Sequence, residues 1–493
     1  MIMGIDFGTT NSLGAYIDKS KKPEVIINER GMRLTPSIVF FKNPQEAVIG
    51  ELARSQMLVR PGQTIFRVKR KMGTRHIYKI FDREYTPSEV GSLILRKIKK
   101  YTSEYLDKEV KKAVITVPAY FDDNQRQAVL QAAKLADIEI MKLLNEPTAA
   151  ALAYQLYSRD TGTILVLDLG GGTFDITLMR CTKGLFEVLT TGGSTELGGA
   201  DFDNILAKWV IETMKEKDNV DLSKDPIALQ QIYNCIERTK VDLSTTTEST
   251  VVIPYIAMNK DGPIHVNLEI SRERFENLTD DLFQKAKQLV ISTLNEIEFD
   301  PDDVDIVVFA GGATRMPRFR EEMGKIFKRS EIKTDINPDE VVALGAAVQA
   351  AIIEGRIKHV ELKDILPHNL GILDDEGRFV PIIERGKVYP TVSTKIFTNT
   401  QDEQNTANIE ILQERSDRIV SLGNFQFKSK SKWKKGEANI AVSFNIDGNG
   451  VLNVSAEDID THEAEEVIIS NGILSLDDNP DHTERRGPGI KIL

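Results

Sequence analysis

Over about the first two-thirds of the chain, short apolar runs alternate with longer stretches whose apolar residues recur at helical spacing. The run KAVITVPAYF (112–121) is typical of a buried strand, and Asp122 and Asp123 follow it at positions that favour the start of a helix. The run IEIMKLL (138–144) and the helical stretch NEPTAAALAYQLY (145–157) repeat this order. Alternating strands and helices predict an α/β layered fold.

The same order returns later in the chain. The run DIVVFAGG (305–312) predicts a strand, and a helix is expected from about Pro317. The following helical stretch NPDEVVALGAAVQAAIIEG (337–355) is rich in alanine and glycine, which suits close packing on a sheet. Between about 200 and 300 the chain is more polar, and stretches such as 271–297 predict a helical insertion.

From about residue 367 the pattern changes to strict alternation of apolar and polar residues. In IAVSFNIDGNGVLNVSAED (440–458), Ile440, Val442, Phe444 and Ile446 face one way, and the turn Asp-Gly-Asn-Gly brings the chain back. This alternation predicts a separate all-β domain of about 100 residues.

The predicted regions are an α/β domain at 1–358, a linker at 359–366, an all-β domain at 367–470 and a tail at 471–493. In the linker, Val360 and Leu362 alternate with Glu361 and Lys363, which suits an edge strand with one buried face. We therefore expect the linker to add to a sheet of the first domain. Proline and glycine interrupt the polar tail, so we expect it to be loose and to form no long helix.

Two glycine-containing turns share one arrangement. VLDLGGGTFD (166–175) has an apolar run, Asp168, three glycines and a threonine, and MGIDFGTTNS (3–12) repeats this order around Asp6. Glycine lets backbone N–H groups approach phosphate oxygens, and the flanking carboxylates require a cation between them and the phosphate. Each turn alone also fits an ordinary hairpin. The duplication, with a third glycine turn in IVVFAGGATRMP (306–317), predicts a magnesium nucleotide held between two similar lobes.

Composition and net charge indicate a soluble globular protein and reduce the number of possible functions. The chain has 493 residues, of which 28% are charged and 41% hydrophobic, an ordinary soluble composition long enough for roughly three domains. The net charge of −11 argues against a nucleic-acid carrier. The lysines of KSKSKWKK (428–435) are interpreted as a solvated surface loop.

Cysteine usage and hydropathy favour a cytoplasmic protein. Cys181 and Cys235 are the only cysteines, so no disulfide framework is indicated. No apolar run reaches the ~18 residues of a membrane span, and no membrane partner is expected. The six histidines show no metal-ligand spacing.

Several stretches together resemble the DnaK-type chaperones, the seventy-kilodalton heat-shock family. They are GIDFGTTNS, AVITVPAYFDDNQRQAV, LLNEPTAAALAY, DLGGGTFDIT, LGGADFD, AGGATRMP and NPDEVVALGAAVQAA. The all-β region matches less closely, through IIERG, QNTANIEILQ and NIDGNGVLNVSAED. The resemblance covers residues 1 to about 470, and the short segment between Lys71 and Lys112 indicates a divergent member nearer the HscC-type branch.

This resemblance implies an actin-like ATPase with two lobes and duplicated ribonuclease-H-like cores, followed by a β-sandwich that holds extended apolar peptides. It implies ATP, ADP and Mg²⁺ as ligands, with K⁺ as a further candidate ion. The implied partners are unfolded or extended polypeptides, a J-domain cochaperone and a nucleotide exchange factor. ATP binding is expected to add the linker to a sheet of the first domain and to open the peptide groove, and hydrolysis is expected to tighten the groove.

The resemblance also assigns roles in the nucleotide site. Lys69 is expected to reach the γ-phosphate and orient the attacking water, which Glu146 orders or receives, and the catalytic set also includes Asp168 and Thr173. Asp6 and Asp168 are expected to hold magnesium through water. The other expected nucleotide contacts are Gly8, Thr9, Thr10, Asn11, Gly170, Gly171, Gly172, Thr173, Gly198, Gly199, Glu237, Lys240, Ser244, Gly311, Gly312, Arg315 and Asp339. Ala313 replaces a serine that is frequent in the family, which puts one nucleoside hydrogen bond in doubt.

These assignments have simpler alternatives. Glu146 is also suited to the first turn of a helix, and Glu237 and Lys240 form an ordinary pair three residues apart on a helix. Spacing alone does not distinguish Lys69 from its neighbouring cations Arg67, Arg70 and Lys71.

The peptide groove is matched through Ile372, Phe397, Ala407, Ile409, Ile411 and Ile440. Ala407 stands where relatives have a larger side chain, and Asp375 lies near a position that is usually apolar. The alternative is that these residues are simply the sandwich core. Pro118, Arg126 and Asp364 are the positions expected to couple the two domains.

The favoured function is an ATP-gated chaperone. The alternatives are an actin-like structural ATPase, a small-molecule kinase on the same scaffold, and a holdase or exchange factor that does not cycle. The all-β domain argues against a filament, and a kinase would transfer phosphate to a small acceptor instead of water. Without a helical lid, we expect bound peptide to leave quickly, because affinity differences among related complexes lie mostly in dissociation rates.

Overall fold

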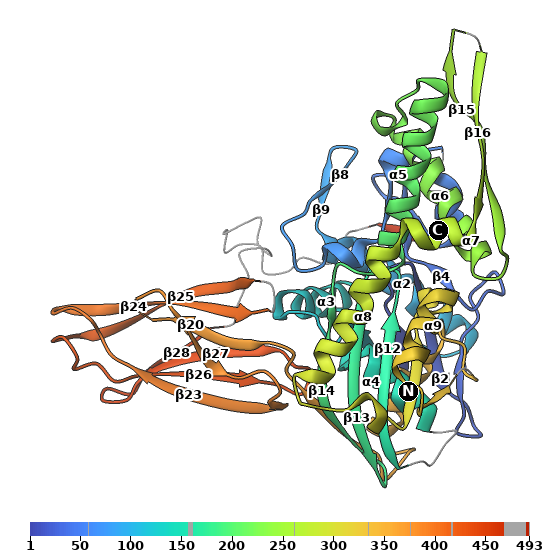
Figure 1. Cartoon of the computed structure of the whole chain (residues 1–493). Coiled ribbons are helices and arrows are strands. Elements are labelled where there is room, and N and C mark those ends of the chain that lie inside the picture. Colours follow the sequence, from blue (N-terminus) through green and yellow to red (C-terminus); the bar gives the residue numbers. More distant parts are fainter. Residues whose placement is uncertain are drawn as a thin grey trace.

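The computed structural model describes residues 1–57, 59–155, 161–260, 262–333, 335–374, 376–415, 418–467 and 490–492. An α/β body with a projecting two-stranded hairpin carries an elongated all-β domain on one side (Figure 1). The expected fold class, an actin-like ATPase followed by a β-sandwich, is confirmed by the two sheets of this body and the two sheets of the β-domain.

Two sheets with matching strand order form the centre of the body. The first sheet runs β3-β2-β1-β10-β11, and the second contains β14-β13-β12-β17-β18. In each sheet three antiparallel strands are followed by two parallel ones. The strands are β1 (Ile2–Asp6), β2 (Asn11–Ile17), β3 (Pro23–Val25), β10 (Lys112–Val117), β11 (Glu139–Asn145), β12 (Gly162–Leu169), β13 (Phe174–Thr182), β14 (Leu185–Ser194), β17 (Ile306–Ala310) and β18 (Glu331–Lys333). The internal duplication predicted from the glycine turns is therefore confirmed.

Equivalent helices follow equivalent strands. In the first lobe these are α3 (Asp123–Leu135) and α4 (Glu146–Gln155), and in the second α9 (Pro317–Ile326) and α10 (Val341–Ile353). Asp122 caps α3 as expected, because its side chain accepts from the Gln125 amide in a capping box. α4 and α10 pack at the junction of the lobes, where a Cβ at Gly345 would lie 1.7 Å from the carbonyl oxygen of Ala149. The small residues of α10 therefore permit the close packing of the lobes.

The other elements of the body cover these sheets. The helices are α1 (Glu51–Gln56), α2 (Pro87–Tyr105), α5 (Gly199–Asp218), α6 (Pro226–Leu243), α7 (Arg272–Leu278) and α8 (Asp280–Asn295). The strands are β4 (Thr35–Pro36), β5 (Ile38–Asn43), β6 (Glu46–Ile49), β7 (Thr64–Phe66), β8 (Tyr78–Ile80), β9 (Arg83–Tyr85), β15 (Glu248–Asn259) and β16 (Gly262–Ser271).

The expectation of a helical insertion between about 200 and 300 is wrong for one part. β15 and β16 pair as a long antiparallel hairpin, which projects at the top of Figure 1. Val251, Ile253, Val266 and Ile270 are buried in the second lobe's core, while the intervening residues lie outward. The alternation of buried and exposed residues in these two strands was not recognised in the sequence because strongly helical stretches lie on either side.

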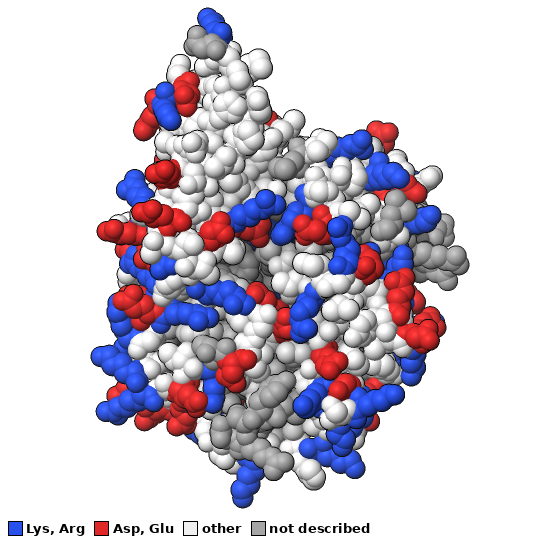
Figure 2. Space-filling model, turned by 90° about the vertical axis from the view of Figure 1, so that its right-hand side faces the viewer, with Lys and Arg blue, Asp and Glu red and all other residues white. Residues whose placement is uncertain are grey.

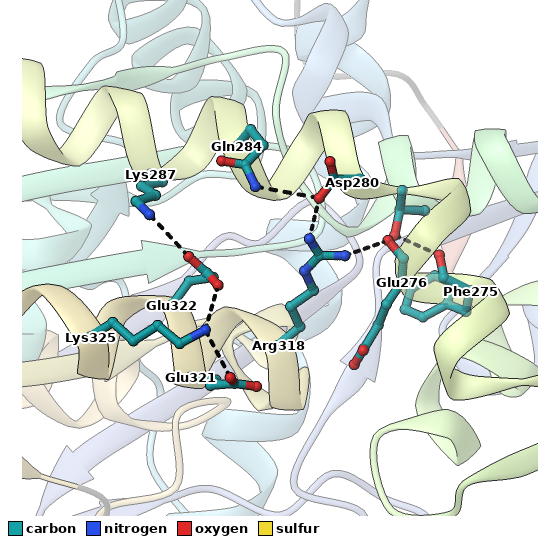
Figure 3. Close-up of polar contacts among 10 residues, drawn as sticks. Phe275, Glu276, Asp280, Gln284, Lys287, Arg318, Glu321, Glu322 and Lys325 are labelled. Carbon is teal, nitrogen blue, oxygen red and sulfur yellow. Dashed lines mark hydrogen bonds and ion pairs between the residues drawn. The ribbon is translucent and has the colours of Figure 1, made fainter.

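Ion pairs join α9 to α8, and a hydrogen bond joins α9 to α7 (Figure 3). The Arg318 guanidinium donates to the carbonyl oxygen of Glu276 at 2.8 Å and pairs with Asp280. Glu322 contacts Lys287 at 3.2 Å and Lys325 at 3.0 Å. Because α9 follows the third glycine turn, these contacts hold that turn against the second lobe.

The β-domain is a sandwich of two sheets with strand orders β21-β20-β24-β25 and β23-β26-β27-β28. The strands are β20 (Asn369–Leu373), β21 (Phe379–Ile383), β23 (Thr391–Phe397), β24 (Gln404–Glu414), β25 (Ile419–Trp433), β26 (Ile440–Ile446), β27 (Leu452–Asp458) and β28 (Glu463–Val467). Ile440, Val442, Phe444 and Ile446 are all buried, as their alternation predicted. The lysine-rich segment 428–435 was expected to be a loop, but it continues β25 to Trp433, with Lys428 and Lys432 exposed and Ser429 and Trp433 buried.

The linker contains β19 (Glu361–Ile365), which pairs in parallel with β14 of the second lobe and antiparallel with β22 (Val388–Tyr389). Val360 and Leu362 pack against the body's core, whereas Glu361 is exposed. Strand addition by the linker is therefore confirmed, and its dependence on ATP stays a prediction.

The end of the chain differs from the expected loose tail. β29 (Lys491–Ile492) pairs in parallel with β6, and the Lys491 amide donates to the carbonyl oxygen of Gln45 at 2.7 Å. Ile490 is buried in the core of the first lobe, and its carbonyl oxygen accepts from Arg96 at 3.3 Å. The rest of the predicted tail, and with it the expectation of no helical lid, lies outside the described residues.

Changing Ile490 to aspartate is expected to release β29. A buried charged group without a partner costs at least about 1–3 kcal/mol, so the β6 amides should exchange hydrogen at least about tenfold faster. Lys491→Asp is the matched control, because residue 491 is exposed and the backbone pairing is unaffected. Equal protection of β6 in both variants, measured by hydrogen exchange, would contradict a stabilising role for Ile490.

Candidate nucleotide site and its connection to the β-domain

A cavity of about 560 Å³ lies between the two lobes. This volume falls within the usual range for small-molecule sites. The predicted site residues that line it are Asp6, Gly8, Thr9, Thr10, Asn11, Lys69, Glu146, Asp168, Gly170, Gly171, Thr173, Gly199, Glu237, Lys240, Ser244, Gly311, Gly312, Arg315 and Asp339. The fold thus brings together residues from both glycine turns, α6 and the turn after β17.

The two duplicated turns face each other across this cavity. A Cβ at Gly171 would lie 2.0 Å from the Thr10 hydroxyl, and one at Gly172 would lie 2.9 Å from the Thr9 side chain. Glycine in the second turn therefore permits close approach of the first turn. This geometry leaves backbone N–H groups of both turns close to one bound group.

Two of the predicted glycines do not line the cavity. A Cβ at Gly198 would lie 2.6 Å from the backbone nitrogen of Gly172. The Gly172 carbonyl oxygen accepts from Arg70 at 3.0 Å. Gly198 therefore supports the second turn from behind, and Gly172, within that turn, packs against Thr9 and Arg70.

Lys69 lies in a 3-10 turn, Val68–Lys71, that follows β7. Its ammonium is 2.5 Å from a Glu146 carboxylate oxygen, and both side chains are buried. Two of the neighbouring cations have other partners: Arg67 pairs with Asp203 at 2.8 Å and Arg70 with Asp201 at 2.6 Å. Lys71 is exposed. Of these four neighbouring cations, Lys69 is therefore the one whose tertiary contacts place it in the wall of the cavity.

Several carboxylates crowd the same end of the cavity. Burial and the nearby Glu146 raise the pKa of Asp6 to about 7, and the same two causes raise the pKa of Asp168 well above its usual value. Burial also raises the pKa of Asp175, which lies beside Thr173, to about 7. Three carboxylates, Asp6, Glu146 and Asp168, share this end of the cavity with one lysine, Lys69, so a divalent cation fits there.

The donor set agrees with a hydrated cation. Among the described residues, no group of three or more histidines, cysteines, aspartates and glutamates is arranged to hold a metal ion. Magnesium keeps several of its waters and needs only one or two carboxylates besides phosphate oxygens. Asp6 and Asp168 fit that requirement.

The other end of the cavity is formed by α6 and the turn after β17. Glu237 lies 3.7 Å from Arg54 of the first lobe, and Lys240 lies 2.7 Å from Asp203. On the opposite wall Arg315 pairs with Asp339 at 2.8 Å. Three further lining residues of α6 were not predicted from the sequence: Asn234, Arg238 and Val241. Asn234 lies three residues before Glu237 and four before Arg238, and Val241 lies four residues after Glu237, so all of them share one face of the helix.

The residue before Glu146 connects the cavity to the linker. Asn145 donates to Asp364 of β19 at 2.8 Å and accepts from Arg126 at 2.7 Å. Asp364 also accepts from Thr148 at 3.2 Å. Pro118 is buried just before α3, and its carbonyl oxygen accepts from the Phe121 amide at 3.2 Å. The three predicted coupling residues therefore lie around one end of the first lobe's sheet.

Three further contacts hold the β-domain against both lobes. Arg415 pairs with Asp122 at 3.2 Å and donates to the Thr195 hydroxyl at 2.9 Å. Arg385 pairs with Glu296 at 2.5 Å.

A buried carboxylate makes the third contact. Asp123 of α3 accepts from the amide of Leu452 at 2.8 Å. Burial raises the pKa of Asp123 to about 7.

The residues matched to the peptide groove belong to the sandwich core. Ile372, Ile409, Ile411 and Ile440 are 1–7% exposed, and Phe397 and Ala407 pack against them. Ile372 pairs with Ile411 in one sheet and Ile440 with Phe397 in the other. In this docked arrangement these side chains therefore face one another across the sandwich. Asp375 lies outside the described residues.

The face shown in Figure 2 carries no patch of a single charge. Acidic and basic side chains are mixed over the face shown in Figure 2, and the hairpin that projects at its top is largely uncharged. Val252, Tyr255 and Met258 of this hairpin are 56–79% exposed. No helix of the described residues is long and apolar enough to cross a membrane.

Comparison with known proteins supplies a family. Residues 2–83 and 77–484 match the family described as Hsp70 protein. The chain belongs to the Hsp70 family. The chaperone protein DnaK of Thermosipho melanesiensis is 40% identical over 478 residues, covering 95% of this chain and 80% of that relative. The chaperone protein dnaK of Phaeodactylum tricornutum is 39% identical over 504 residues, covering 97% of this chain and 82% of that relative.

The resemblance to DnaK-type chaperones is thus confirmed. This Hsp70 chain is an ATP-dependent chaperone and an ATP hydrolase, and the filament alternative is not favoured. Its position in the HscC-type branch stays a prediction.

The raised pKa of Asp123 gives docking of the β-domain a pH dependence. A docked-state value of about 7 lies above the ordinary 3.8, so protons favour docking. The contribution of Asp123 to docking is fully present below about pH 4. As the pH rises from there to about 7 this contribution is lost, and the equilibrium constant for docking falls by up to about tenfold per pH unit.

Asparagine at position 123 does not titrate and keeps an acceptor for Leu452. We expect Asp123→Asn to favour docking increasingly over the unaltered chain between pH 4 and 7, with no further change above. Hydrogen exchange of the Leu452 amide, compared between the two proteins at each pH, measures this difference. A difference that does not vary with pH would show that Asp123 is charged in both states.

Proposed function

We propose that the cavity binds ATP with Mg²⁺ and that Lys69, Glu146, Asp168 and Thr173 carry out its hydrolysis. The observation that carries this proposal is the buried Lys69–Glu146 ion pair beside Asp6 and Asp168, between two glycine turns. A preorganised cation where phosphate charge develops is the type of electrostatic group that contributes most to such reactions.

In this proposal each wall has a separate task. Thr9, Thr10 and the amides of residues 170–173 bind the β- and γ-phosphates, while Glu146 accepts a hydrogen bond from the attacking water. Asp6 and Asp168 hold magnesium through water, and bound magnesium neutralises phosphate charge. Potassium is a further candidate ion. Adenosine lies between two sets of residues, Glu237, Lys240 and Ser244 on one side and Gly311, Gly312, Arg315 and Asp339 on the other.

We also propose that hydrolysis is transmitted through β11 and the linker. Glu146 faces the cavity, and the adjacent Asn145 holds Asp364 of β19 and Arg126. A change at Glu146 on loss of the γ-phosphate therefore displaces the group that anchors the linker. Pro118 supports this end of the sheet from the start of α3.

The proposed units are an ATPase domain at 1–358, a linker at 359–366 and a peptide-binding sandwich at 367–470. The sandwich takes extended apolar segments when its two sheets rearrange, since the matched groove residues lie in the core in the docked arrangement. A J-domain cochaperone and a nucleotide exchange factor are the proposed partners. A cytoplasmic location agrees with the two free cysteines.

Changing Lys69 to alanine is expected to retain ATP binding and to slow cleavage about 10²–10³-fold, since Lys69 acts on charge that develops in the transition state. Lys71→Ala is the matched control, because that lysine is exposed. Single-turnover chemical quench measures cleavage, and equilibrium titration with ATP measures binding. Cleavage within about threefold of the unaltered rate would remove Lys69 from the catalytic set.

Changing Asp364 to alanine is expected to abolish the stimulation of ATPase activity by an apolar peptide while basal cleavage stays within about threefold. The physical reason is the loss of the acceptor that Asn145 and Thr148 share. Glu361→Ala, on the same strand but exposed, serves as the control. If the Asp364 variant responds to peptide as fully as the control, signalling does not pass through this contact.

A further inference from the structure

A second cavity, which we call the side chamber, has a volume of about 430 Å³. It lies where the two lobes meet the β-domain, and its walls include Lys71 of the first lobe, Glu196 of the second and Arg418 of the β-domain. Thr9, Lys69 and Thr173 line both the side chamber and the nucleotide cavity. The two cavities therefore adjoin at the end where the proposed function places the γ-phosphate.

The walls of the side chamber are basic. Among the described residues that line it, five side chains are cationic and two are acidic, Asp122 and Glu196. The cations are Lys69, Arg70 and Lys71 from the turn after β7, and Arg415 and Arg418 from the β-domain. A cavity with this excess of positive charge attracts small anions.

Three of these cations pair with carboxylates of the described residues. Lys69 pairs with Glu146, Arg70 pairs with Asp201, and Arg415 pairs with Asp122. The Lys71 ammonium makes no ion pair with any described residue, and the side chains of Lys71 and Arg418 are exposed. These two cations come from different walls of the chamber, one on the first lobe and one on the β-domain.

We propose that the side chamber receives the inorganic phosphate formed by hydrolysis and that the phosphate leaves through it. This inference rests on the proposed function. In the reaction, water adds its oxygen to the γ-phosphorus, the bond to the β–γ bridging oxygen breaks, and that oxygen stays on ADP. The water's proton goes to solvent, and hydrogen phosphate is left beside Thr9, Lys69 and Thr173. ADP stays in the nucleotide cavity, on the side away from the side chamber.

The β-domain forms the outer wall of this exit. Arg415 spans from Asp122 on the first lobe to Thr195 on the second, so it closes the side chamber while the β-domain is docked. Undocking removes Arg415 and Arg418 and opens the chamber. By linkage, phosphate in the chamber favours the docked state and its loss favours release of the β-domain.

The test uses the full chain with Lys71→Glu and Arg418→Glu combined. The matched control combines Lys208→Glu and Arg329→Glu, which change net charge equally at side chains 76% and 74% exposed. Rapid chemical quench follows ATP cleavage, and a fluorescent phosphate sensor follows free phosphate in the same single turnover. A separate titration measures the affinity of inorganic phosphate for the ADP-bound chain.

We expect cleavage to stay within about twofold in both double variants. The delay between cleavage and phosphate release should shorten about 3–10-fold in the chamber variant alone, because the chamber then holds phosphate less tightly, and phosphate affinity should fall by a similar factor. Lys71→Arg with Arg418→Lys should restore both values.

Equal delays and equal phosphate affinities in the two double variants would overturn the chamber proposal. A change in the cleavage rate that accounts for the whole change in delay would also overturn it, because these cations would then act in the chemistry. Absence of cleavage in the unaltered chain would instead contradict the proposed function and the side chamber with it.

Discussion

The buried ion pair between Lys69 and Glu146 is the contact on which the rest of the site depends. Burying an isolated charge is costly, and each of these residues offsets the other. Both belong to the first lobe, and they face Asp168 at the end of the second lobe's first strand. The charge balance of the cavity therefore depends on how closely the two lobes approach, and the glycine turns allow that approach.

The neighbouring residue extends this dependence to the β-domain. Asn145 and Glu146 are consecutive, yet one contacts the linker and the other the catalytic lysine. Successive side chains at the end of a strand point in different directions, so a single backbone segment serves both sites. A shift of that segment alters the cavity and the linker together, without a long chain of intermediates.

The interface between the body and the docked β-domain also contains buried polar groups. Asp123, Asp364 and His368 all lie between the body and the β-domain, and burial lowers the pKa of His368 to about 3 while it raises those of the two carboxyls. Such groups are stable only while their hydrogen-bond partners stay in place. The interface is thus suited to a cooperative change between docked and separated states.

The sequence by itself determined the features that depend on neighbouring residues. These include the duplicated glycine turns, the capped start of α3 at Asp122, the period-two strands around Ile440 and the strand character of the linker. Each follows from local backbone requirements and burial on one face, and each was readable without knowledge of the rest of the chain.

Tertiary structure alone decided the features that depend on partners distant in sequence. It selected Lys69 over its neighbours, because Asp203 and Asp201 hold Arg67 and Arg70. It kept Gly172 and Gly198 out of the cavity wall, extended β25 by pairing with β24, and buried Ile490 beside β6. The residues near each of these positions in the sequence do not indicate its distant partner, because the free energy of each contact arises only when the fold brings the two segments together.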